Sequence, residues 1–194
     1  MKPLILLSLV LFALAACKKE EKIAPETTPQ KSTTAIVVKP DTIPDSAALK
    51  ICLVKDTINT DETMFVFNHT YSLGYVFDQD APYFQGFGQV SLASISSGGK
   101  YLAINGLPYT SGMSIGLDVQ AKTSGAYSLQ ISYERKIPST VQILLKDTYL
   151  KDSIDVRTHN YNFHVSKTDT NSFGSKRFKL ILKNDGQQQA TLAH

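Results

Sequence analysis

The chain has 194 residues, of which 42% are hydrophobic and 19% are charged. This length and composition allow one domain with its own core and leave little room for a second. The net charge is only +3, and Lys and Arg are scattered among acidic residues apart from the short basic run at residues 176–179. A nucleic-acid partner is therefore not expected.

The N-terminal residues have the order of parts of an export signal. Met1 and Lys2 form a basic start, and an apolar run follows from Leu4 to Ala16. This run fits the hydrophobic region of a signal peptide and is shorter than the roughly 20 residues that cross a bilayer. We therefore expect residues 1–16 to be a signal peptide.

The end of this run, Leu14-Ala15-Ala16-Cys17, resembles the lipobox of bacterial lipoproteins. The resemblance implies that Cys17 carries a diacylglycerol and becomes the acylated first residue of the mature protein. Two or three acyl chains hold a protein at a membrane for long times, so the membrane is an expected partner. The alternative is a plain secretory signal, in which Ala13-x-Ala15 is an ordinary cleavage site.

The charged residues after Cys17 bear on which side of the membrane the protein occupies. The run Lys18, Lys19, Glu20 and Glu21 resembles the export signal of Bacteroidetes surface lipoproteins. This resemblance implies lipid anchoring in the outer membrane, facing the cell exterior. The alternative is a solvated start to a linker on the periplasmic side.

Residues 17–45 comprise the acylated cysteine and a linker rich in Lys, Glu, Thr and Pro. Because the linker lacks aromatic residues and has few apolar ones, we expect a disordered tether. The segments Asp41-Thr42-Ile43 and Asp45-Ser46-Ala47 resemble the O-glycosylation motif of Bacteroidetes exported proteins. The resemblance implies Thr42 and Ser46 as modification sites.

From Ala47 to Lys183 the hydrophobic period is two. We therefore expect one domain at residues 46–186, followed by a flexible tail at residues 187–194. Tyr127, Leu129, Ile131 and Tyr133, for example, alternate with polar residues and should share one sheet face. Turn signals separate the segments, among them Asn105-Gly106-Leu107-Pro108. We therefore predict an all-β domain: an antiparallel β-sandwich, jelly-roll or Ig-like, of about eight to ten strands. The alternating apolar positions are Met64 and Val66 or Phe65 and Phe67; Val90 and Leu92; Ile115, Leu117 and Val119; Val141, Ile143 and Leu145; Tyr161, Phe163 and Val165; and Phe178, Leu180 and Leu182.

A second resemblance covers most of this domain. The segments Gly99–Pro108, Ile115–Val119 and Gly125–Leu129, in that order, resemble a β-sandwich module of large Bacteroidetes surface proteins. In those proteins the module lies just before the C-terminal sorting domain of the type IX secretion system, and Phe77–Ala81 resembles its acidic loop. The resemblance implies surface architecture and binding but no reaction. We expect the lipid anchor to replace the sorting domain.

Motifs of enzymes and metal sites are weak. Gly112-Met113-Ser114-Ile115-Gly116 spells a nucleophile-elbow pattern, but an apolar strand continues after it, so Ser114 should be a solvent-facing strand residue. His159 and His164 should lie on opposite faces of a strand and form no metal site. Asp78 and Asp80 could offer oxygens to calcium, although a solvated turn explains them as well. No cofactor is expected.

One segment has an unusual density of aromatic residues among glycines and a proline, which favours a long loop. Exposed rings there could stack on sugars or anchor a protein contact. We expect instead that most of them point inward, because a core without Trp needs the volume of Phe and Tyr. The rings are those of Tyr71, Tyr75, Phe77, Tyr83, Phe84 and Phe87.

Three functions are therefore open. The first is a noncatalytic surface lipoprotein whose domain is a structural or protein-binding module, such as an adhesin-like or accessory subunit. The second is a glycan-binding lipoprotein that uses the aromatic segment at residues 71–87. The third, a hydrolase, requires Ser114 or a carboxylate pair beside a base in a pocket.

Overall fold

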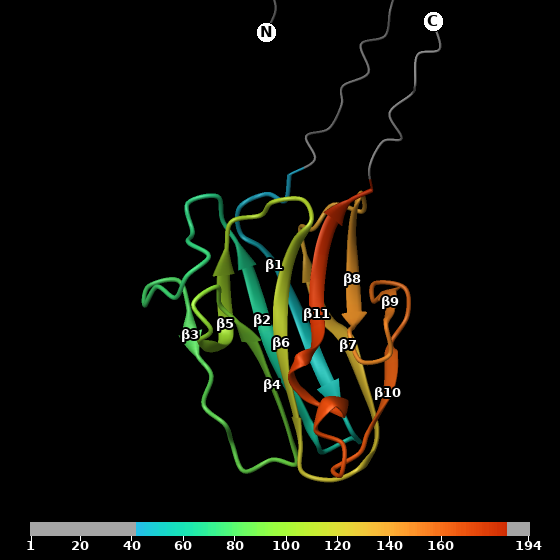
Figure 1. Ribbon diagram of the computed structural model, residues 1–194. Coiled ribbons are helices and arrows are strands. Elements are labelled where there is room, and N and C mark those ends of the chain that lie inside the picture. The colour runs from blue at the N-terminus through green and yellow to red at the C-terminus, as the bar shows by residue number, and fades with distance from the viewer. Residues whose placement is uncertain (1–41, 186–194) are drawn as a thin grey trace, which may run out of the picture. The chain divides into compact units, whose positions relative to one another are not determined.

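Eleven β-strands and one short 3-10 helix make up residues 42–185, the part of the chain that this computed structural model describes (Figure 1). The predicted all-β fold is confirmed. The number of strands exceeds the predicted range because it includes β3, a strand of two residues. The elements are β1 Ala47–Val54, β2 Thr60–Phe67, β3 Ala81–Pro82, β4 Val90–Ile95, β5 Tyr101–Leu107, β6 Met113–Ala121, β7 Gly125–Arg135, β8 Val141–Asp147, β9 Asp152–Asp155, β10 Tyr161–Val165, η1 Thr170–Ser172 and β11 Gly174–Asn184.

The strands form one continuous hydrogen-bonded sheet, not the two separate antiparallel sheets that we predicted. Its order is β10-β7-β1-β2-β5-β4-β6-β11-β8-β9, with β3 paired to β5. The sheet is mixed, because Met64–Phe67 of β2 runs parallel to Ile104–Leu107 of β5. This parallel pair joins the two halves of the sheet. It depends on a long connection between the two strands, which strand periodicity does not reveal.

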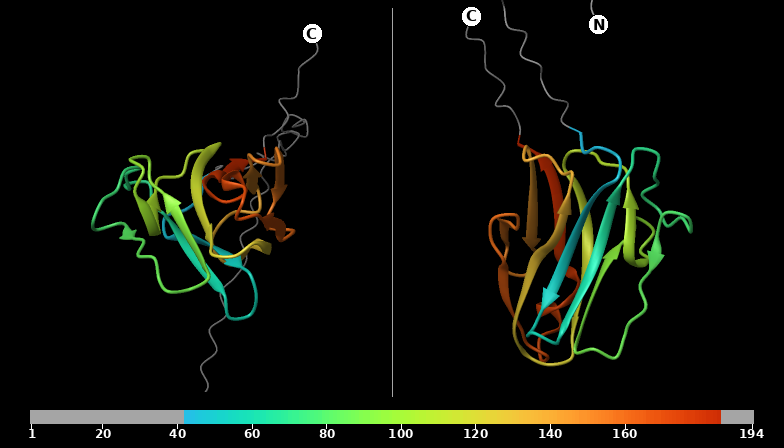
Figure 2. Two further views of the ribbon diagram at one scale, coloured as in Figure 1. Left: turned by 60° about the horizontal axis from the view of Figure 1, so that its bottom comes forward. Right: turned by 180° about the vertical axis from the view of Figure 1, so that it is seen from behind.

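The sheet curls until its two ends approach each other and is nearly closed (Figures 1 and 2). β10, at one end, contacts β8 and β11 near the other end. The hydroxyl group of Tyr161 donates a hydrogen bond of 3.0 Å to Asp147, and the Phe163 and Phe178 ring centres are 4.8 Å apart. The curl encloses the core and places the alternate polar residues of each strand on the outside.

Period-two alternation is observed in most strands. In β2 the buried pair is Phe65 and Phe67, which settles the choice that the sequence left open. Ile43, ahead of the first strand, is also part of the core. The other buried positions include Leu49, Ile51, Leu53, Leu92, Leu117, Val119, Leu129, Ile143, Leu145, Leu180 and Leu182.

The prediction that four apolar residues of β7 share one face is wrong for the last of them. Tyr127 and Leu129 are buried, but Tyr133 is 41% exposed. The pairing of β1 with β7 shifts between Lys50 and Ile51, which face Tyr133 and Ile131 respectively. Ser132 is therefore an extra residue in β7, and this bulge turns Tyr133 to the outside.

The predicted turn at residues 105–108 is also wrong, because Asn105, Gly106 and Leu107 continue β5. Gly106 is needed here for close packing. A Cβ atom at this position would lie 2.8 Å from Cδ2 of Tyr71 and 2.9 Å from the carbonyl oxygen of Gln79. The glycine lets the segment that follows β2 lie directly on β5.

Candidate functional site

The predicted aromatic segment is a long connection between β2 and β4, and we call residues 68–89 the aromatic loop. Apart from the two-residue β3, it has no regular structure, as the sequence predicted. The expectation that most of its six rings point inward is wrong, since none of them is buried. The core is filled instead by aliphatic residues and by rings from other strands, such as Phe65 and Phe178.

The three tyrosines of the aromatic loop hold it to the sheet. Tyr71 packs over Gly106, and the Lys100 ammonium group lies 3.4 Å from the centre of the Tyr75 ring. The Tyr83 hydroxyl donates a hydrogen bond of 2.6 Å to Oδ2 of Asp61 on β2. Burial, together with this hydrogen bond to a carboxylate, raises the pKa of Tyr83 to about 12.

Asp80 fixes the centre of the same loop. Its Oδ1 accepts a 2.8 Å hydrogen bond from the Gly106 amide, and its Oδ2 accepts a 2.7 Å bond from the Val76 amide. Asp80 is therefore a buried structural residue, not one of a solvated pair, while Asp78 is exposed. Within residues 42–185, no group of three or more His, Cys, Asp or Glu side chains could hold a metal ion.

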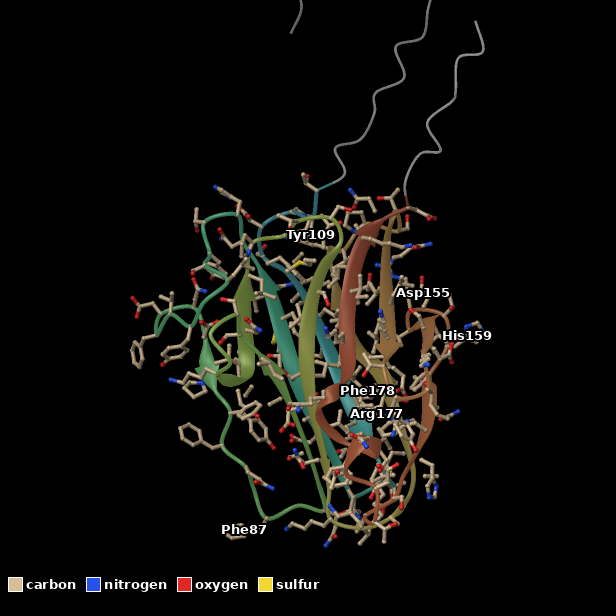
Figure 3. All side chains as sticks on the ribbon, in the orientation of Figure 1. Phe87, Tyr109, Asp155, His159, Arg177 and Phe178 are labelled. Atoms are coloured by element: carbon tan, nitrogen blue, oxygen red, sulfur yellow. The ribbon has the colours of Figure 1, made fainter. Side chains whose placement is uncertain are left out.

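The three phenylalanines of the loop point into solvent. Phe77 is 81% exposed, Phe84 is 83% exposed and Phe87 is fully exposed. Figure 3 shows Phe87 at the outer edge of the molecule, on the strand-free stretch that leads to β4. Leu73 and Val76 of the same loop are exposed as well. The loop therefore carries three projecting apolar rings, and hydrogen bonds hold its backbone over residues 76–83.

A second feature is a cleft of about 580 Å³ on the outer face of β6, beside a bulge in β11. Gly174 pairs with Val119 and Phe178 pairs with Leu117, so residues 175–177 of β11 face the single residue Asp118 of β6. Three residues opposite one force β11 to arch away from its neighbour. The arch leaves the outer face of β6 open at Asp118.

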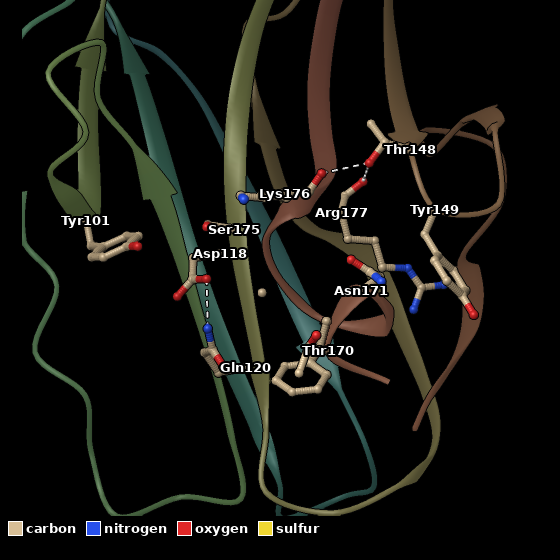
Figure 4. A pocket seen from close by; sticks show the side chains of 12 residues that line it. Tyr101, Asp118, Gln120, Thr148, Tyr149, Thr170, Asn171, Ser175, Lys176 and Arg177 are labelled. Atoms are coloured by element: carbon tan, nitrogen blue, oxygen red, sulfur yellow. Dashed lines mark hydrogen bonds between the residues drawn. The ribbon is translucent and has the colours of Figure 1, made fainter. Parts of the chain in front are cut away.

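Aromatic and polar side chains line this cleft (Figure 4). Tyr101 of β5 stands on one side and Tyr149, after β8, on the other, with Asp118 and Gln120 of β6 between them. Nε2 of Gln120 donates a 2.9 Å hydrogen bond to Oδ1 of Asp118. Lys176 of the bulge completes the rim.

Asp118 occupies an unfavourable place for a charge. Its carboxylate is partly buried and forms no salt bridge with any residue in the described range 42–185. Burial raises the pKa of Asp118, and the hydrogen bond from Gln120 opposes this shift. A carboxylate kept in such a position is a candidate for ligand contact.

Below the cleft, the bulge turns Arg177 into the core, where it is 1% exposed (Figure 3). Its Nε and Nη2 donate hydrogen bonds of 3.0 and 2.8 Å to Oδ2 of Asp147, which is fully buried. Its Nη1 donates to the carbonyl oxygens of His164 and Ser172. Arg177 is therefore a structural residue that fixes the bulge, and it adds nothing to a basic surface.

The other residues singled out in the sequence lie apart from these two features or outside the described range. Ser114 is an exposed residue of β6, as predicted, and His159 and His164 are exposed polar residues. Thr42 and Ser46 are exposed too. Cys17 and the charged run at residues 18–21 lie outside the described residues.

The cleft could not be predicted from the sequence. Asp118 and Gln120 are polar positions of an alternating strand, and such positions usually mean only a solvated sheet face. The one local sign is Arg177 beside Phe178, two consecutive buried residues that break the alternation of β11. A charged residue at the start of an apolar strand is too common to reveal a bulge by itself.

The chain matches no protein-family model, and neither a curated protein nor a solved structure is similar enough to count as a match. Within the described residues, no helix has the length and apolar character needed to cross a membrane. A proposal about what the domain binds therefore depends on the geometry of the aromatic loop and of the cleft.

Proposed function

We propose that the chain is a noncatalytic, lipid-anchored surface protein whose all-β domain docks a protein partner through the aromatic loop. The observation that carries the proposal is that the six rings of the loop have two different environments. Three tyrosines attach the loop to the sheet, while Phe77, Phe84 and Phe87 project into water and contribute nothing to the core.

A projecting phenylalanine on a fixed backbone has the properties of an interface anchor. Burial of an exposed aromatic ring against a partner supplies much of the free energy of a typical hot spot. The hydrogen bonds of Asp80 and Tyr83 already hold residues 76–83 of the loop, so binding there costs little further backbone entropy. The exposed phenylalanine rings are therefore available for a protein contact before the partner binds.

The chemistry of the loop favours a protein over a sugar at this surface. A phenylalanine ring offers no hydrogen-bonding group, and the exposed Leu73 and Val76 of the same loop are aliphatic. Sugar recognition needs donors and acceptors for the hydroxyl groups as well as a stacking face. A partner with apolar sockets fits the three rings better.

No reaction is part of the proposal. The nucleophile-elbow pattern requires Ser114 to sit at a strained turn between a strand and a helix. Ser114 instead lies within the continuous strand β6. The domain is proposed as a scaffold that presents a surface.

The anchor and the location are proposed from the N-terminal residues alone, because Cys17 lies outside the described residues. A Cys17→Ala variant should fail to incorporate labelled palmitate and should be released from the membrane fraction. Incorporation of the label at the wild-type level by this variant would remove the lipoprotein proposal.

Position-specific photo-crosslinking tests the docking surface. A photoreactive phenylalanine analogue is placed at Phe84, and, as a matched control, at Ile58, which is 88% exposed in the turn between β1 and β2. In cells that make the full chain, we expect a discrete crosslinked protein from position 84 and none from position 58. Equal products from both positions would contradict docking by the loop.

A further inference from the structure

Several polar groups in the cleft over β6 have hydrogen-bonding capacity that no other described residue uses. Asp118 accepts a hydrogen bond only from Gln120, which leaves its second oxygen unused. The Tyr101 hydroxyl and the Lys176 ammonium group form no hydrogen bond with residues 42–185. All of these groups line one hollow, so a single ligand can reach them together (Figure 4).

The cleft also offers flat apolar faces. Tyr101 is 45% exposed and Tyr149 is 43% exposed, on opposite sides of the hollow. Tyr149 is held in place, because its hydroxyl donates a 2.8 Å hydrogen bond to Asp169 and the Arg177 guanidinium lies 5.0 Å from its ring centre. A fixed ring loses little freedom when a ligand stacks on it.

The charges of the lining indicate a ligand without net charge. Asp118 and Lys176 carry opposite signs, so together they favour neither an anion nor a cation. A carboxylate accepts hydrogen bonds from hydroxyl groups, and an ammonium group donates to their oxygens. A ligand with many hydroxyl groups and an apolar C–H face satisfies both the polar groups and the rings.

We propose that this cleft is a binding site for a neutral saccharide, with Asp118 and Lys176 contacting its hydroxyl groups and the rings of Tyr101 and Tyr149 contacting its apolar C–H faces. Gln120 is a positioning residue, since its amide holds the Asp118 carboxylate. The site is distinct from the exposed rings of Phe77, Phe84 and Phe87, none of which lines the cleft, and failure of the saccharide proposal would leave the protein-docking proposal intact.

An array of neutral oligosaccharides built from hexoses, pentoses and N-acetylhexosamines, probed with the labelled full chain, tests the proposal. Hits are then titrated by calorimetry. Asp118→Asn keeps the shape of the side chain and removes its charge, and Tyr101→Ala removes the ring. Tyr133→Ala is the matched control, because Tyr133 has nearly the same exposure and lies on β7, outside the cleft.

We expect wild-type protein to bind at least one neutral oligosaccharide. Asp118→Asn and Tyr101→Ala should each weaken binding by about tenfold or more, as expected for the loss of a charge-assisted hydrogen bond or a stacking face. Tyr133→Ala should bind as wild type does.

Three outcomes would overturn the proposal. The first is no binding to any neutral member of the array. The second is unchanged affinity in both cleft variants. The third is a pair of results: a Phe84→Ser, Phe87→Ser double variant loses saccharide binding, while Tyr101→Ala binds normally. This pair would assign the sugar to the aromatic loop.

Discussion

Asp147 is fully buried and Asp118 is partly buried, and the groups around the two carboxylates differ. Asp147 is buried against Arg177 and the Tyr161 hydroxyl, so its charge is compensated. Burial alone would raise the pKa of Asp147, yet the hydrogen bonds from Arg177 and from the Leu150 amide lower it below its ordinary value. Asp118 has no such cation. The Asp147 carboxylate therefore stabilises the fold, whereas the Asp118 carboxylate is available to a ligand.

Replacement of Asp147 by alanine tests this structural role. Asp147→Ala leaves the Arg177 guanidinium buried without its anion, which should cost about 3–5 kcal/mol of unfolding free energy. Denaturant unfolding measures the loss. The control is Glu134→Ala, which breaks the partly exposed pair with Arg157 and should cost less than about 1 kcal/mol. Similar losses in both variants would contradict the role assigned to Asp147.

The Asp147–Arg177 pair also predicts that the unfolding free energy decreases at acidic pH. Because the folded-state pKa of Asp147 lies below its unfolded value of about 4, the carboxylate contributes stability above that pH. This contribution is lost as the pH falls through the folded-state pKa. The unfolding free energy of the wild type should therefore drop below about pH 4, and Asp147→Ala should show a weaker drop.

At the scale of elements, the aromatic loop shows where sequence reasoning succeeded and where it failed. Its glycines and Pro82 predicted a loop, and a loop is observed. Its rings were expected inside because ring volume is normally core volume. The sequence could not reveal that Asp80, 26 residues before its partner Gly106, holds the backbone of the loop against β5.

Asp80→Ala tests whether Asp80 orders this loop, and Asp78→Ala is the matched control. Asp80→Ala leaves the amides of Gly106 and Val76 without their acceptor and should cost about 1–3 kcal/mol for each buried amide that stays unsatisfied. Asp78→Ala should be nearly neutral, because Asp78 is exposed. Limited proteolysis should cut the 68–89 segment faster only in Asp80→Ala. Equal cutting rates in the two variants would show that Asp80 does not order the loop.

For the whole molecule, period-two alternation predicted an all-β domain and most of its buried positions. It did not predict one curled sheet, because the parallel pair of β2 and β5 depends on a connection of more than 30 residues. Nor did it predict the bulges, where side chains such as those of Tyr133 and Arg177 lie on the opposite face of the sheet from the one that alternation predicts. The aromatic loop and the cleft both arise at these departures from regular pairing.

The central claim is that Phe77, Phe84 and Phe87 form the contact with a protein partner. The most direct test is the dissociation constant of the partner crosslinked at position 84, measured with purified full-length chains. Replacement of all three phenylalanines by serine should weaken binding by about a hundredfold or more and leave the melting temperature unchanged, because the rings are exposed. A control with Ile58→Ser, Tyr133→Ser and Leu150→Ser should bind as the wild type does. Undiminished binding by the triple phenylalanine variant would contradict the claim.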